Sequence, residues 1–370
     1  MKEFYNKVAI LFFLFFSIKT FSQQIILSNK ATVSVLTCDQ GNQLHSLFGH
    51  TAIRINDPEV GFDAVYNFGY FDFNTPNFYL KFVKGDMTYF VAVDSFENFM
   101  AEYKYYQRGV YEQVLSISVL EKQQIFQKLN LILQSDDRFY TYKFIDRNCT
   151  TMVVDLLKNT IKINLTTKIE GQGKTYREIL YGYLVDHFYE KLGINIIFGA
   201  KVDSKFNKIF LPLQLLESIK KCKTSDNLNL CADTKKLNKQ SVIGDFSIWN
   251  NIFTLILFLS FICWQNNQKI KNAYFVIVGL LGLFLAGVGF YSFHSEVSMN
   301  YNVILFNPFL VLIPFVNNLK TLKFLILFIA ASIFMYLIYV LNKPFVAIVA
   351  PLIITNMFLL IQKFRSLKTA

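Results

Sequence analysis

The pattern of apolar and polar residues divides the chain into two unlike halves. From Gln23 to Asp245, short stretches alternate apolar with polar residues or repeat apolar residues at helical spacing. From Ser247 onward, long apolar runs follow one another with only short polar breaks. The pattern therefore predicts a folded polar domain followed by a membrane domain.

The first half contains patterns typical of both strands and helices. Alternation and β-branched or aromatic residues predict strands at 31–38, 50–57, 64–71, 87–94 and 110–119. Apolar residues at helical spacing predict helices at 121–134 and 150–159, and one or two more within 175–193. We expect an α+β domain over residues 23–219. The stretch 220–246, rich in Lys, Asn, Ser and Thr, predicts an exposed linker.

The second half, 247–370, is predicted to be an all-α bundle of five transmembrane helices. No run contains a charged residue, although several are shorter than the ~20 residues of a typical span. Prolines within the third and fifth runs predict kinks or packed interiors. The runs are 248–264, 273–293, 303–316, 324–341 and 345–361.

Basic residues alternate between the connections of these runs. The first, third and last connections hold seven, whereas the second and fourth hold only Lys343. The positive-inside rule therefore predicts that the first half lies outside the cytoplasm and the C-terminus inside. The seven are Lys269, Lys271, Lys320, Lys323, Lys363, Arg365 and Lys368.

The N-terminus has the pattern of a signal peptide over residues 1–22. Lys2 and Lys7 accompany a short apolar run, and small residues at Thr20 and Ser22 predict cleavage before Gln23. A retained membrane anchor is the alternative, but the apolar run is short for a span. This signal and the basic residues agree: both predict a multi-pass membrane protein whose first half lies outside the cytoplasm.

The net charge of +11 does not indicate nucleic-acid binding once it is located along the chain. Between Gln23 and Asp245, 26 basic residues stand against 24 acidic ones, a net charge of only +2. The sequence therefore predicts no basic patch for DNA or RNA. It also has no metal or nucleotide motif, so we expect no cofactor.

The chain has five cysteines, and their positions indicate which of them could act as a nucleophile. Cys222 and Cys231 flank a short polar loop, and in an oxidising compartment they predict a disulfide. Cys263 lies within the first apolar run. Cys38 ends a predicted strand with no helix behind it, which favours a packing role. Cys149 therefore remains as the candidate nucleophile.

Cys149 stands at the start of a predicted helix, in "FIDRNCTTMVVDLL". Unpaired N–H groups and the helix dipole favour a thiolate there and predict a lowered pKa. His50, the first residue of a predicted strand, is the preferred candidate base. His45 and His187 are the other histidines of this half. The plainer alternatives are a packed cysteine and a structural histidine. Asp146 and Asn148 are expected to cap the helix.

The chain resembles a known family through "LTCDQGNQLHSLFGHTAIRI", "YNFGYFDF", "FYLKFVKGDMTYFV", "YYQRGVYEQVL" and "YKFIDRNCTTMVVDLL". These segments are similar to the periplasmic domain of the Lnb-type bacterial lipoprotein N-acyltransferases. That domain is similar in turn to circularly permuted NlpC/P60 papain-like enzymes, in which a strand histidine precedes a cysteine at a helix start. His50 and Cys149 match those positions. Met152 departs from the pattern, where a basic residue is expected.

The resemblance implies an acyltransferase with a cysteine nucleophile and a histidine base. It also implies a multi-pass protein of the bacterial inner (cytoplasmic) membrane, with a periplasmic N-terminal domain and a cytoplasmic C-terminus. It implies phospholipid as acyl donor and the N-terminal amine of diacylglyceryl-cysteine lipoproteins as acceptor. A third polar residue after the histidine orients the ring in such sites, and here Asn67 is favoured over Tyr66. The candidate substrate-binding residues are Arg54, Tyr66, His294 and Asn302, the last two in the polar connection "HSEVSMNYN".

Three other functions remain open from the sequence. A cell-wall peptidase or amidase of the NlpC/P60 type would use the same pair of residues, and a phospholipase would use water in place of the amine. A membrane-tethered binding protein would use neither residue for chemistry.

Overall fold

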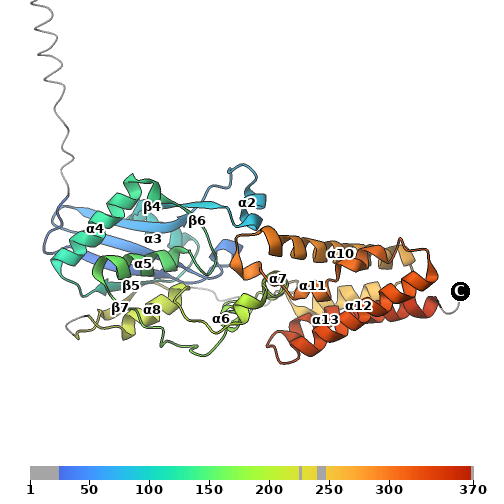
Figure 1. The fold of residues 1–370 in the computed structure, drawn as a ribbon. Helices are drawn as coiled ribbons and strands as arrows, with labels where there is room; N and C mark the ends of the chain where they lie inside the picture. The colour runs from blue at the N-terminus through green and yellow to red at the C-terminus, as the bar shows by residue number, and fades with distance from the viewer. Residues whose placement is uncertain (1–24, 225–226, 240–246, 368–370) are drawn as a thin grey trace, which may run out of the picture.

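The structure is a computed structural model that describes residues 25–224, 227–239 and 247–367. A sheet domain forms one end of the molecule and a bundle of apolar helices forms the other (Figure 1). This is the α+β domain followed by helices that the sequence predicts. The predicted signal peptide, 1–22, lies outside the described residues.

The domain is built on one seven-stranded antiparallel sheet with the order β6-β4-β3-β2-β1-β5-β7. Five of the strands overlap the five predicted ones. The strands are β1 Thr32–Cys38, β2 His50–Asp57, β3 Phe62–Tyr70, β4 Thr88–Ser95, β5 Val110–Leu115, β6 Phe139–Thr141 and β7 Cys231–Asn238.

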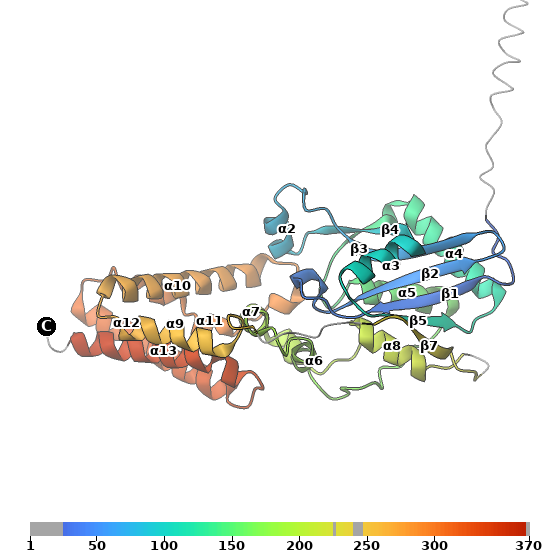
Figure 2. The same cartoon turned by 180° about the vertical axis from the view of Figure 1, so that it is seen from behind.

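Helices cover both faces of this sheet (Figures 1 and 2). They do so because successive side chains of a strand point to opposite faces, and here both faces carry apolar residues. Ile53 and Ile55 of β2 belong to one core with α4 (Val119–Gln134) and α5 (Cys149–Ile161). Ala52, the residue before Ile53, points to the opposite face and belongs to a second core with α3 (Phe96–Tyr105). The remaining helices of this half are α2 Phe78–Lys84, α6 Tyr176–Gly182, α7 Phe188–Ile197 and α8 Pro212–Lys221.

The stretch 220–246, predicted to be an exposed linker, contributes a strand to the sheet. Residues Cys231–Asn238 form β7, which pairs with β5 at the edge. The predicted Cys222–Cys231 disulfide is wrong for this structure, in which both thiols are free. Cys222 Sγ donates to the Asn164 carbonyl and Cys231 Sγ to the Asp233 carbonyl, so each thiol points to a backbone acceptor.

The prediction of five transmembrane helices is wrong in number: three described helices are long and apolar enough to cross a membrane. They are α10 Gln268–Tyr291, α12 Leu319–Val340 and α13 Val346–Ser366. The first predicted span is the 13-residue α9 (Ile252–Trp264), about 20 Å long against a hydrocarbon core of about 30 Å.

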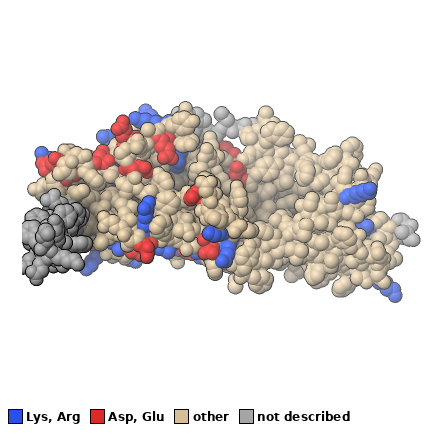
Figure 3. Space-filling view, turned by 90° about the horizontal axis from the view of Figure 1, so that it is seen from above, with Lys and Arg blue, Asp and Glu red and all other residues tan. Residues whose placement is uncertain are grey.

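The third predicted span is divided rather than continuous. It consists of α11 (Asn302–Leu305) and the 3₁₀ helix η5 (Pro308–Leu312), separated by Phe306 and Asn307. A side chain at Gly282 of α10 would meet the Phe306 carbonyl, so this segment packs closely against α10. Figure 3 shows charged residues across the sheet domain but few along the helical half, where basic residues lie at the far end.

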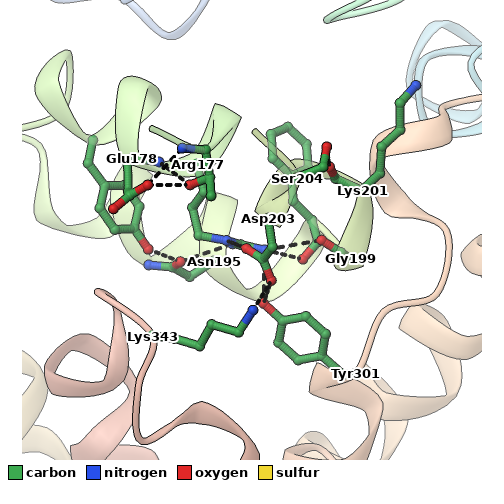
Figure 4. Close-up of polar contacts among 12 residues, drawn as sticks. Arg177, Glu178, Asn195, Gly199, Lys201, Asp203, Ser204, Tyr301 and Lys343 are labelled. Carbon is green, nitrogen blue, oxygen red and sulfur yellow. Dashed lines mark hydrogen bonds and ion pairs between the residues drawn. The ribbon is translucent and has the colours of Figure 1, made fainter. Parts of the chain in front are cut away.

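A buried polar cluster joins the two halves (Figure 4). Arg177 of α6 is fully buried, and all three guanidinium nitrogens donate hydrogen bonds. Its partners include Asp203, at 2.6 Å, and the Tyr301 hydroxyl of the membrane half, at 3.1 Å. Tyr301 and Lys343 both reach the Asp203 carboxylate. This ion-paired arginine is therefore one of the contacts that hold the membrane half against the sheet domain.

Candidate active site

Cys149 occupies the first position of α5, as the sequence predicts. Asn148 is the N-cap residue, and its Oδ1 accepts from the Thr151 N–H at 3.0 Å. Thr151 Oγ1 in turn accepts from the Asn148 N–H at 2.8 Å, which completes a reciprocal cap. The capping role predicted for Asn148 is confirmed. Asp146 instead forms ion pairs with Lys201 and Lys208.

Gly69, at a bulge in β3, lies between Cys149 and His50. A β-carbon there would be 3.8 Å from Cys149 Cβ and 3.9 Å from His50 Cε1. Gly69 has φ of +122°, a conformation that only glycine adopts readily. The neighbouring residues also meet, since Thr51 Oγ1 lies 3.0 Å from Thr150 Oγ1. The fold thus brings together two residues that stand far apart in the chain.

Asn67 holds the imidazole of His50. Its Oδ1 lies 3.2 Å from His50 Nε2, and its Nδ2 donates to Asp94 Oδ2 at 3.1 Å. Because a carboxylate oxygen accepts, the Asp94 contact turns the amide nitrogen away from the histidine and its oxygen towards it. Nε2 must therefore carry the proton, which leaves Nδ1 with a free lone pair. The Tyr70 hydroxyl also donates to Asp94, at 2.7 Å.

Burial keeps both candidate catalytic groups neutral. It lowers the pKa of His50 from 6.5 to about 4, although the hydrogen bond to Asn67 opposes this. Burial also raises the pKa of Cys149, and hydrogen bonds from the backbone of Thr51 and Thr150 reduce this effect only in part. The prediction that the helix N-terminus lowers the thiol pKa is therefore wrong, because desolvation outweighs it.

An apolar wall lies beside the sulfur. Met87, Tyr89 and Tyr140 form a small buried cluster, to which Tyr142 and Met152 pack. The rings of Tyr89 and Tyr142 stack at 4.4 Å between centroids. Met152 lies one helical turn after Cys149, so the residue that departs from the family pattern extends this wall.

Two of the predicted substrate-binding residues lie within structural contacts of the sheet domain. Arg54 makes a two-pronged ion pair with Asp63 and a second with Glu112, beneath which Phe96 packs. Tyr66 is buried in the core, and its hydroxyl donates to Asn130. The Arg54 guanidinium and the Tyr66 hydroxyl are therefore both engaged in contacts within the sheet domain.

The other two lie at the junction of the halves. Asn302 is fully buried, donates to the Asn195 carbonyl and accepts from the Tyr336 hydroxyl. His294 Nε2 lies 3.0 Å from the Phe82 carbonyl, and Nδ1 lies 3.9 Å from Glu296. Glu296 is fully buried and accepts from the Ile145 N–H at 2.8 Å. This connection therefore reaches the turn just before Cys149.

Sequence reasoning missed Asp94 and Tyr70, which complete the chain of hydrogen bonds behind His50. Asp94 closes the predicted strand 87–94, where an acidic residue is ordinary. Only the β3–β4 register, in which Val65 faces Asp94, brings it beneath Asn67.

These observations define a class: a protein whose α+β domain gathers a cysteine, a histidine and an asparagine at one end of a sheet, attached to a bundle of apolar helices. Residues 18–182 match the family model of the Lnb N-terminal periplasmic domain. The predicted resemblance is confirmed over that range, which includes Cys149, His50 and Asn67. Comparisons with curated proteins and with solved structures gave no match.

Proposed function

We propose that the protein transfers an acyl chain from a membrane phospholipid through Cys149 to the N-terminal amine of diacylglyceryl-cysteine lipoproteins. The observation that carries this is the convergence of Cys149 and His50 on Gly69, with Asn67 fixing the ring. The family match and the three membrane-length helices support a lipid substrate.

The first half-reaction begins with two neutral groups. His50 Nδ1 takes the thiol proton as Cys149 Sγ attacks the ester carbonyl, so the sulfur is charged only as it reacts. The C–O bond of the ester then breaks, His50 returns the proton to the leaving lysophospholipid oxygen, and a thioester remains. Backbone N–H groups of Cys149, Thr51 and Thr150 lie close to Sγ and would stabilise the negative charge that develops on the sulfur as the proton leaves.

The second half-reaction transfers the chain to nitrogen. The amine of the lipoprotein attacks the thioester carbonyl, and His50 Nδ1 accepts the proton that the amine loses. The C–S bond breaks, and the proton returns to sulfur, which regenerates the thiol. In this proposal the domain is a permuted papain-like fold in the periplasm, on the inner membrane, with the C-terminus in the cytoplasm.

Mass spectrometry of lipoprotein N-termini tests the proposal directly. Cells lacking their own N-acylation should gain N-acylated lipoproteins when they express the chain, and not when they express Cys149→Ala. An unchanged N-terminus with the intact chain would overturn the proposal.

The same purified protein separates the remaining functions. A hydroxylamine-labile mass of one acyl chain on Cys149 indicates a thioester, whereas a peptidase would cleave peptidoglycan fragments without that mass. A phospholipase would release fatty acid at the same rate whether or not acceptor peptide is present. A binding protein would show none of these changes.

A further inference from the structure

The segment between β3 and β4, residues 71–86, exposes large apolar side chains. Phe73, Tyr79 and Leu80 are 67%, 80% and 69% exposed, and Phe82 is 44% exposed. A soluble surface rarely gathers so many in one short segment. Figures 1 and 2 both show its helix, α2, projecting from the sheet domain beside the end of α10.

This segment is fastened to the end of a membrane-length helix. The Phe293 N–H donates to the Lys84 carbonyl at 2.7 Å, and Ser292 Oγ donates to the Val83 carbonyl at 2.8 Å. Phe290 and Phe293 at the end of α10 are themselves 92% and 58% exposed. The exposed apolar residues at the end of α10 therefore lie next to those of the segment that contains α2.

The charges of the segment fit the surface of a bilayer. α2 contains Lys81 and Lys84 and no acidic residue. Lys84 pairs with Asp86, whereas Lys81 forms no ion pair with any residue that the structure describes. A short element with exposed aromatic residues and lysines is typical of the interface between headgroups and acyl chains.

The opposite side of the segment leads towards Cys149. Phe78 packs against Phe71, with ring centroids 5.9 Å apart, and Phe71 packs against Tyr89 at 5.0 Å. Tyr89 stacks on Tyr142 within the cluster that includes Met152. A row of aromatic side chains thus runs from α2 to the wall beside the sulfur.

We propose that residues 71–86 rest in the outer-leaflet interface of the bilayer, and that the aromatic row beneath them is the route by which an acyl chain reaches Cys149. The first part depends only on the position and chemistry of the segment. The second part rests on the proposed acyl transfer.

The depth of the segment tests the first part. A fluorescent amino acid placed at position 80 of the full chain, in phosphatidylglycerol-containing proteoliposomes, should be quenched several-fold by phospholipids brominated on the upper acyl chain. The matched control is position 120 on α4, at the far end of the sheet domain, since Leu120 is 68% exposed and Leu80 is 69% exposed. Equal quenching at the two positions would overturn the interfacial placement.

The route is tested by comparing two acyl donors. Phe78→Ser should lower Cys149 acylation from a long-chain phospholipid about tenfold relative to acylation from a short, water-soluble ester. Phe78→Leu, which stays apolar, should keep the wild-type ratio, and Phe73→Ser provides a second variant at an exposed position. An unchanged ratio in both serine variants would overturn the route.

The experiments distinguish a failure of this proposal from a failure of the proposed function. If wild-type Cys149 takes an acyl group from neither donor, the acyl transfer and the route are overturned together. Quenching at position 80 would still establish the interfacial segment in that case.

Discussion

Two polar clusters of this protein are built in opposite ways. At the junction of the halves, Arg177 has every guanidinium nitrogen engaged, and the Asp203 carboxylate accepts from three side chains. Beside the sheet, Cys149 is only partly buried, and within the described residues Asn67 is the one side chain that is hydrogen-bonded to His50. In the Arg177 cluster, every guanidinium nitrogen is used in a hydrogen bond that holds the structure. In the Cys149 cluster, the thiol and the Nδ1 atom of His50 remain available for reaction.

The difference shows why a buried polar cluster is not by itself a sign of catalysis. If Arg177 or Asp203 were removed, the remaining charge would be buried without a partner, which would destabilise the fold. The pair is therefore structural. Cys149 and His50 are neutral because of burial, and they gain charge only when a substrate reacts. Substitutions should therefore affect stability in the first cluster and chemistry in the second.

The largest expected effect comes from removing the nucleophile. Cys149→Ala should lower acyl transfer at least about 1,000-fold because no thioester can form. Activity is measured by lipoprotein mass spectrometry, and stability by thermal unfolding in detergent.

Cys38→Ala is the matched control for that prediction, because Cys38 is fully buried in the core against α3. It should destabilise the protein and leave transfer intact. Equal loss of transfer in the two variants would refute the distinction between a packed and a reactive thiol.

Breaking the junction should produce the next largest effect. Arg177→Met leaves Asp203 largely buried without its main partner and should cost about 3 to 5 kcal/mol in unfolding free energy. Lys343→Met, which removes the longer 3.3 Å contact to Asp203, should cost about 1 kcal/mol. Denaturant unfolding measures both, and similar stability in the two variants would contradict the central position of Arg177.

The orientation of His50 should matter for turnover more than for folding. Asp94→Asn replaces a carboxylate, which can only accept, with an amide that can also donate. The Asn67 amide is then free to flip, and the wrong ring nitrogen of His50 becomes protonated. We expect kcat to fall on the order of 100-fold with little change in KM. Arg54→Met, on the same sheet but away from Cys149, should leave kcat unchanged. A wild-type kcat in Asp94→Asn would exclude the hydrogen-bond chain.

The smallest effect is in the response to pH. The pKa of His50 is about 4 in the folded protein but 6.5 ordinarily, so the unfolded chain binds a proton first as the pH falls. His50 therefore contributes to a loss of stability between about pH 6.5 and 4. His50→Gln should flatten that part of the stability curve, measured by unfolding across the pH range. An unaltered slope in the variant would show that His50 is not held neutral.

Local patterns in the chain predicted much of the fold. The alternation in 31–38 and 50–57 predicted β1 and β2 because successive side chains of a strand point to opposite faces of the sheet. α3 and β7 were missed, since their residues carry a weaker pattern and are held by packing against the sheet. The sequence located five apolar runs, but it did not predict where the helices within them begin and end. The division of the third run into α11 and η5, for example, is seen only in the folded structure.

The sequence by itself determined the two-part architecture, the start of α5 at Cys149 and the order of histidine before cysteine, because these depend on periodicity, capping and composition. The tertiary structure decided that His50 and Cys149 meet at Gly69, that Asp94 lies behind Asn67, and that Arg54 and Asn302 are used for structure. It also decided that the thiol is neutral. Proximity and burial arise from contacts between residues far apart in the chain, and no local pattern encodes them.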